Sequence, residues 1–144
     1  MSARPVRQRA QRRYDDSGTV TAFVVVFMSA LLLMAGLVLD GGLALAAKVD
    51  AIDEAQAAAR AGAQAVDVPT YRSTGQVTLD PAEAVADADA YLAATGRTGT
   101  VSVQGEQVTV TVTIAQPTEI LSLVGVGHIT VTGTGTATAE QEAP

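Results

Sequence analysis

The stretch SGTVTAFVVVFMSALLLMAGLVLDGG, residues 17–42, contains an uninterrupted uncharged run from Val20 to Leu39. At about 1.5 Å per residue, a helix over this run is about 30 Å long, close to the thickness of a bilayer's hydrocarbon core. The hydrophobic regions of secretory signals are shorter, at about 7–15 residues. A helix buried in a soluble protein rarely presents an apolar surface on all sides over such a length. The run therefore predicts a transmembrane helix over residues 19–40.

The charges on either side of this helix predict its orientation. A basic head over residues 1–18 precedes it and contains five arginines: Arg4, Arg7, Arg9, Arg12 and Arg13. Residues 14–144 contain four basic and fifteen acidic side chains. Because basic flanks remain cytoplasmic, we expect a single-pass protein of the cell membrane with a cytoplasmic N-terminus and an extracytoplasmic C-terminus. The acidic exterior disfavours nucleic acid as a partner.

The composition offers little for catalysis. The chain has no cysteine, which excludes disulfides and thiolate zinc sites, and it has one histidine, His128. No serine lies in a G-x-S-x-G context, and no glycines match a G-x-G-x-x-G phosphate loop. We therefore expect a protein that is not an enzyme, with no cofactor, no metal and no small-molecule substrate.

Residues 41–66 predict a second, alanine-rich helical segment with distinct faces. Alanine, the strongest helix former, supplies eleven of the 24 residues from 43 to 66. Helical periodicity predicts an apolar stripe and, beside it, a set of small residues. The apolar stripe is Leu45, Val49, Ile52, Ala59, Ala63 and Val66. The small-residue set is Ala44, Ala51, Ala55, Ala58, Gly62 and Ala65.

Small side chains let two helices approach closely. The small-residue set is therefore a candidate assembly interface for another helix, either of this chain or of a neighbouring subunit. Alternatively, alanine simply favours helix here. Asp40 has two interpretations as well: it meets a partner's charge during assembly, or it faces water at the outer membrane interface. Gly41 and Gly42 are expected to weaken the helix and to allow a bend, since glycine costs about 1 kcal/mol per helical position.

Residues 67–144 predict a small extracytoplasmic α+β domain. Residues 67–79 are expected to form a loop, and Asp80-Pro81-Ala82-Glu83 predicts a capping box that starts a helix ending near Thr95, with Gly96 after it. Alternating valines then predict two strands joined by a turn at 105–106, followed by a short helix that ends at Gly125. A last strand is predicted over residues 128–139, with five threonines on one face.

This domain has few large side chains and one apolar sheet face, so it is marginal by itself. The apolar stripe is the expected cover for that face. The predicted fold class is thus α+β and membrane-anchored: a long N-terminal transmembrane and amphipathic helix packed on a small antiparallel sheet, which is the plan of a pilin.

The N-terminal third also resembles a known family. The run SGTVTAFVVVFMSALLLMAGLVLDGGLALAAKVDAIDEAQAAARAGAQAV, residues 17–66, is similar to the N-terminal region of the TadE/TadG-like proteins of tight-adherence (Flp) pilus systems. The shared features are a glycine before an apolar span, an Asp-x-Gly-like exit and an alanine-rich helix. The resemblance implies pilus assembly or secretion, with the lipid bilayer and other Tad pilus subunits as partners.

The resemblance also implies roles for particular positions. Gly18 corresponds to the glycine at which pilin-type precursors are processed, whereas the fifth residue after it is Phe23 in place of the glutamate of those precursors. Asp40 and the helix over residues 53–66 correspond to assembly positions.

Three functions follow from these observations. The first is a minor pilin or assembly component of a Tad-type pilus or a related secretion apparatus. The second is a single-span membrane protein whose extracellular domain binds a partner without forming a filament. The third is a secreted protein that is cleaved near Ala46, after the A-x-A sequence 44–46.

Overall fold

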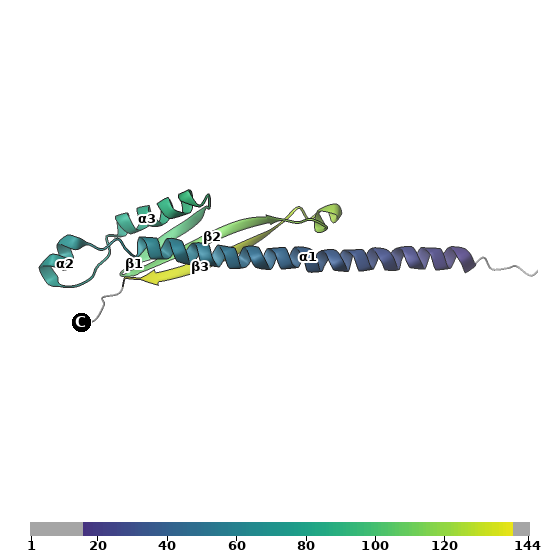
Figure 1. The fold of residues 1–144 in the computed structure, drawn as a ribbon, viewed down its shortest axis with the longest axis horizontal. Helices are drawn as coiled ribbons and strands as arrows, with labels where there is room; N and C mark the ends of the chain where they lie inside the picture. Colours follow the sequence, from purple (N-terminus) through teal and green to yellow (C-terminus); the bar gives the residue numbers. More distant parts are fainter. Residues whose placement is uncertain (1–15, 140–144) are drawn as a thin grey trace, which may run out of the picture. The chain divides into compact units, whose positions relative to one another are not determined.

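The computed structural model describes residues 16–139 (Figure 1) and has an α+β fold, as the sequence predicts. The predicted basic head lies outside the described residues, apart from its last positions. In chain order, the elements are α1 (Asp16–Gly62), α2 (Val68–Thr74), α3 (Pro81–Ala94), β1 (Gly99–Gln104), β2 (Gln107–Pro117), the 3-10 helix η1 (Leu121–Val124) and β3 (His128–Thr138).

The chain divides into two compact units, Met1–Ala35 and Gly36–Pro144, and α1 contributes to both. Every described side chain from 18 to 35 is exposed, and the rings of Phe23 and Phe27 stack with their centroids 6.0 Å apart. Within residues 16–139, α1 is the helix that is long and apolar enough to cross a membrane, judged by length and composition. Signal sequences near an N-terminus share these two properties.

The second unit contains an antiparallel three-stranded sheet in the order β1-β2-β3. Its register pairs Val101 with Val110 and Val110 with Gly135, so apolar positions share one face across all three strands. The predicted turn at 105–106 is confirmed. Gly105 has a φ of 61°, a backbone conformation that glycine adopts at low cost.

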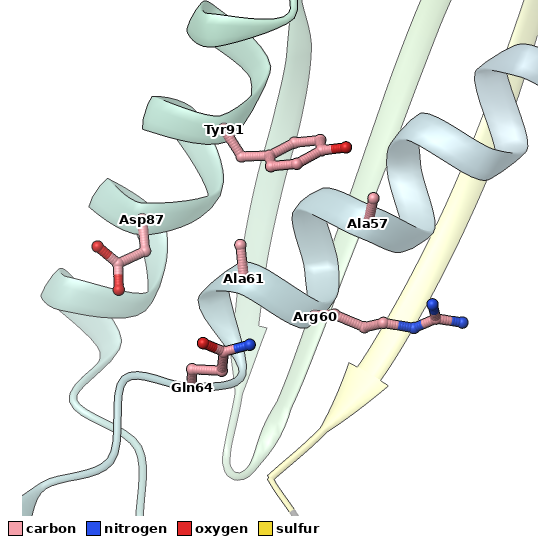
Figure 2. Close-up of a pocket in the computed structure, with 6 residues that line it drawn as sticks. All are labelled: Ala57, Arg60, Ala61, Gln64, Asp87 and Tyr91. Carbon is pink, nitrogen blue, oxygen red and sulfur yellow. The ribbon is translucent and has the colours of Figure 1, made fainter.

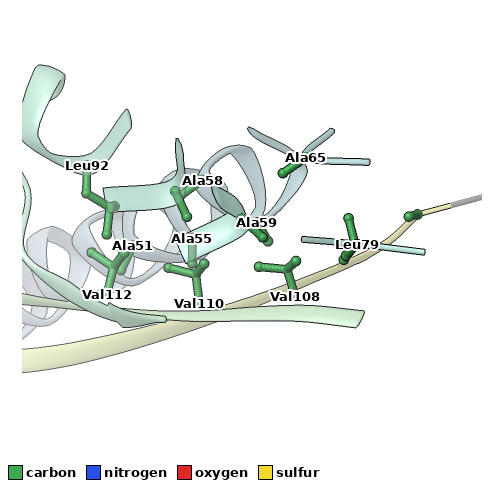
Figure 3. Close-up of a cluster of buried hydrophobic side chains, with 13 residues drawn as sticks. Ala51, Ala55, Ala58, Ala59, Ala65, Leu79, Leu92, Val108, Val110 and Val112 are labelled. Atoms are coloured by element: carbon green, nitrogen blue, oxygen red, sulfur yellow. The ribbon is translucent and has the colours of Figure 1, made fainter. Parts of the chain in front are cut away.

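One face of the sheet carries the core. Three valines of β2 point at the alanines of α1, and α3 closes the side (Figure 3). The buried set is Ala51, Ala55, Ala58, Ala59, Ala65, Leu79, Ala84, Ala88, Leu92, Val108, Val110, Val112 and Ala139. The opposite face carries the threonines, and two cross-strand pairs of threonine hydroxyls lie 3.4 Å apart. The core thus lies between one sheet face and two helices.

The predicted helix after Asp80 is confirmed as α3. The Asp80 carboxylate accepts the N–H groups of Ala82 and Glu83 at 2.9 and 3.2 Å. At the other end, Gly96 has a φ of 68° and the Arg97 N–H donates to the Leu92 carbonyl at 2.8 Å. This bonding satisfies the last carbonyls of the helix.

The prediction of a loop over residues 67–79 was wrong for its first half, which forms α2. Asp67 caps this helix: its carboxylate accepts the Thr70 N–H at 3.0 Å and the Thr70 hydroxyl at 2.6 Å. These two bonds, the hydroxyl first, hold the pKa of Asp67 below its ordinary value. Pro69 fits the first turn, where its missing N–H has no intrahelical partner to lose.

Gly41 and Gly42 do not interrupt α1, which continues as a helix through both glycines. The helix is held on either side of them, by Gly36 and Asp40 before and by Ala47 and Ala51 after, all buried in the same unit. The helix ends at Gly62, not at Val66. The chain leaves it to pair Val66 with Leu79 in an isolated bridge.

Candidate functional site

Asp40 is the most distinctive polar residue of the second unit, since its side chain is only 1% exposed. Its Oδ1 accepts the N–H of Glu119 at 2.9 Å, and its Oδ2 accepts the N–H groups of Ile120 and Leu121 at 3.1 and 2.7 Å. The expectation that Asp40 faces water was therefore wrong. The carboxylate instead fastens the β2–β3 loop to α1 by charge-assisted hydrogen bonds.

Gly36 completes this attachment one helical turn before Asp40, on the same face of α1. A Cβ built on Gly36 would lie 2.4 Å from Cγ2 and 2.8 Å from Cβ of Ile120. The Ile120 side chain thus occupies the space that any larger residue at position 36 would need. The spacing Gly-x-x-x-Asp was the signal for this site in the sequence, but its partner lies about eighty residues further along the chain.

The small-residue set packs within the chain. Ala51, Ala55 and Ala58 are fully buried, Gly62 and Ala65 are buried, and Ala44 is half-buried. A Cβ on Gly62 would lie 2.6 Å from the Ala84 carbonyl oxygen of α3. Their partners are therefore the sheet and α3 of this chain. The structure contains one chain, so their role in assembly stays a prediction.

Two glycines of β3, overlooked in the sequence as contact positions, bring the sheet against this set. A Cβ on Gly133 would lie 2.2 Å from the backbone carbonyl carbon of Ala51, and one on Gly135 would lie 2.2 Å from the backbone nitrogen of Gln56. Backbone thus meets backbone. The signal was two glycines at alternate positions on an apolar strand face, a pattern typical of close approach by another backbone.

We expected the apolar stripe to cover the sheet. This segment of α1 does cover the sheet, but the face of the helix that turns toward the sheet is not the one expected. Leu45 and Val49 are 66% and 50% exposed, while Ala59 of the same stripe is buried. The reason is steric. Next to Gly133 and Gly135 the helix lies too close to the sheet for leucine or valine, so the alanines face inward.

This arrangement predicts the effect of enlarging the small-residue set. We expect Ala58→Leu to lower the melting temperature by about 5–15 °C, because overpacking a filled core costs about 1–3 kcal/mol. Ala46→Leu, at an exposed position of α1 with the same change in helix propensity, is the control. Thermal unfolding in detergent, followed by circular dichroism, measures both. An unchanged melting temperature together with loss of partner subunits would favour the intermolecular interface instead.

An open groove of about 560 Å³ lies between α1 and α3 (Figure 2). Its lining is Ala57, Arg60, Ala61, Gln64, Asp87 and Tyr91. The Tyr91 ring extends from α3 toward Ala57, and the Arg60 guanidinium points away from Asp87 toward β3. Within residues 16–139, no three His, Cys, Asp or Glu side chains gather into a group that could hold a metal ion. The groove thus presents small, polar and charged side chains.

Gly18, the predicted processing position, lies in α1, and a Cβ built there would meet no atom within 4 Å apart from those of its chain neighbours and of the nearby helix backbone. Processing at Gly18 stays a prediction.

Comparison of the chain with protein-family models, with curated proteins and with solved structures finds no match. The chain's own geometry and the resemblance of residues 17–66 are therefore the two indications of its function.

Proposed function

We propose that this protein is a membrane-anchored, pilin-like subunit or assembly component of a Tad (Flp)-type pilus or a related secretion apparatus, and that it acts by packing, without catalysis. One observation carries the proposal. A single helix, α1, contains the uncharged run Val20–Leu39 and then supplies, from Ala47 to Gly62, the apolar cover of a small antiparallel sheet. Anchor and domain thus share one element, which suits a subunit that is held in a membrane while its outer domain is presented to partners.

The charge distribution supports the orientation of the proposed anchor. The five arginines before the run belong on the cytoplasmic side, and the acidic remainder belongs outside. Lipid surrounds residues 20–39 in this arrangement. That environment matches the exposure of every side chain from 20 to 35.

The contacts of Asp40 favour an anchored chain over a secreted one. Cleavage near Ala46 would remove both Gly36 and Asp40 from the mature protein. The three amides of residues 119–121 would then lose three charge-assisted hydrogen bonds, and the loop would lose its attachment to the helix. A retained N-terminal helix keeps the loop attached.

Assembly with other pilus subunits requires a surface that the chain leaves open. Exposed apolar side chains on the second half of α1, Leu45 and Val49, form such a surface, since large exposed apolar residues that lie together mark interaction sites. The proposed interface is therefore these two residues, beside the buried small-residue set.

Single cysteines test both parts of this proposal, because the chain has none of its own. Asp89→Cys, exposed on α3, should react with a membrane-impermeant maleimide in intact cells, while Ser2→Cys should react only after lysis. Val49→Cys should form crosslinks to other subunits with a short bismaleimide, and Asp89→Cys should not. Labelling of Ser2→Cys in intact cells, or release of an N-terminally shortened chain into the medium, would refute the anchor. Equal crosslinking at both positions would refute the interface.

A further inference from the structure

The loop between β2 and β3, residues 118–127, ends in an apolar tip formed by Leu123, Val124 and Val126. Their side chains are 83%, 57% and 43% exposed. No charged residue occurs from Ile120 to Gly127. Aliphatic side chains so exposed are unfavourable in water, at about 25 cal/mol per Å² of apolar surface. The tip therefore favours an apolar environment outside this chain.

The loop is held in one conformation by its own hydrogen bonds. Thr118 closes its base by donating its N–H to the Gly127 carbonyl at 3.2 Å and its hydroxyl to the Val126 carbonyl. Inside the loop, the Val126 N–H donates to the Leu121 carbonyl at 3.0 Å. Gly125, with a φ of 94°, provides the reversal. The side chains of the tip are thus displayed by a closed and bonded loop.

The position of the tip along α1 follows from its attachment. Asp40 binds the amides of residues 119–121, and Ile120 fills the space beside Gly36. Leu39, next to Asp40, is the last residue of the uncharged run. The loop is therefore fastened to α1 at the level where a membrane-spanning run would leave the hydrocarbon core.

We infer that the apolar tip lies in the outer headgroup layer of the bilayer that α1 enters, as a second contact with lipid. This inference rests on the proposed membrane anchor. The last residues of the uncharged run, Leu37, Val38 and Leu39, lie in the same unit and also have exposed apolar side chains. Interfacial segments bury apolar side chains about 5–10 Å into the headgroup boundary, a depth within reach of a loop attached at Asp40. The polar residues Glu119 and His128, near the two ends of the loop, are exposed, and the inferred position leaves them in water.

Single tryptophans in the full-length protein test the inference, since the natural chain has none. The protein is reconstituted into phosphatidylcholine vesicles that contain lipids with a quencher placed either near the headgroup or at the acyl-chain end. Leu123→Trp reports on the tip, and Leu32→Trp reports on the anchor. Gln104→Trp is the matched control, because it lies by the opposite end of β2, roughly 30 Å away along an eleven-residue strand.

The expected result is quenching of Leu123→Trp by the shallow quencher, several-fold stronger than for Gln104→Trp, together with a blue-shifted emission. Leu32→Trp should respond to the deep quencher. Quenching of Leu32→Trp without quenching of Leu123→Trp would overturn the inference and leave the anchor intact. If Leu32→Trp is not quenched, both the anchor and the lipid contact fail. A blue shift of Leu123→Trp that depends on protein concentration and not on quencher would assign the tip to a second protein copy, which also overturns the inference.

Discussion

Gly135→Val is expected to unfold the sheet-containing unit, because the new side chain has no space. A Cβ at this position would lie 2.2 Å from the backbone nitrogen of Gln56 and 2.4 Å from the backbone carbonyl carbon of Ala55. Overpacking against flexible side chains costs about 1–3 kcal/mol. Here the obstructing atoms are backbone, which cannot rotate away, so the whole helix must move off the sheet. We expect a melting temperature lower by more than roughly 10 °C, or no cooperative transition at all.

Thr136→Val is the matched control, since it introduces the same valine one position later on the exposed face of β3. Its melting temperature in detergent should stay near that of the natural protein. Ala55→Gly should not rescue Gly135→Val, because the obstruction at position 55 is a backbone carbonyl carbon and not the alanine methyl group. A stable Gly135→Val protein, or rescue by Ala55→Gly, would show that side chains and not backbones set the distance between helix and sheet.

Replacing Asp40 should release the β2–β3 loop from α1. In Asp40→Leu, three amide donors lose their acceptor. In Asp40→Asn, the side chain keeps one carbonyl oxygen that can accept a hydrogen bond. Its other oxygen is replaced by an NH2 group, which is a donor and therefore cannot bond to the backbone N–H groups of the loop. We expect amide hydrogen exchange at Glu119, Ile120 and Leu121 to become about tenfold faster or more, because a donor without a partner favours local opening. The effect should be larger for leucine than for asparagine.

Asp50→Asn, at an exposed position of the same helix, controls for the loss of a negative charge. Exchange at the centre of β2, for example at Val110, should change little in all three variants, since its bonds lie in the sheet ladder. Unchanged exchange at 119–121 in Asp40→Leu would mean that the loop holds its position without the carboxylate. The inferred lipid contact would then lose the attachment that sets its level.

Local signals in the sequence predicted most elements of the second unit. The α3 helix was predicted from Asp80 and Gly96, whose bonding partners lie within a few residues of each. The β1–β2 hairpin and β3 followed from side-chain alternation, which reports directly on a strand's two faces. The α2 helix was missed because it is short and its signal, Asp67 followed by Pro69, resembles that of a turn.

The candidate site was predictable only in part. Asp40 and the small-residue set were recognised as unusual from their positions on α1. Their partners were not, because the amides at 119–121 and the glycines of β3 lie about eighty residues away along the chain. Periodicity within one helix carries no information about contacts at that separation.

The sequence alone thus determined α1, α3 and the three strands, that one long helix joins an uncharged run to an alanine-rich one, and that this helix covers the small sheet. Which face of the helix turns inward was decided by tertiary structure. Burying the face with Leu45 and Val49 would remove more apolar surface from water. Burying the alanine face instead lets the helix backbone come closer to the sheet. Gly133 and Gly135 settle this competition, because they bring the sheet backbone so close to α1 that only the alanine face fits.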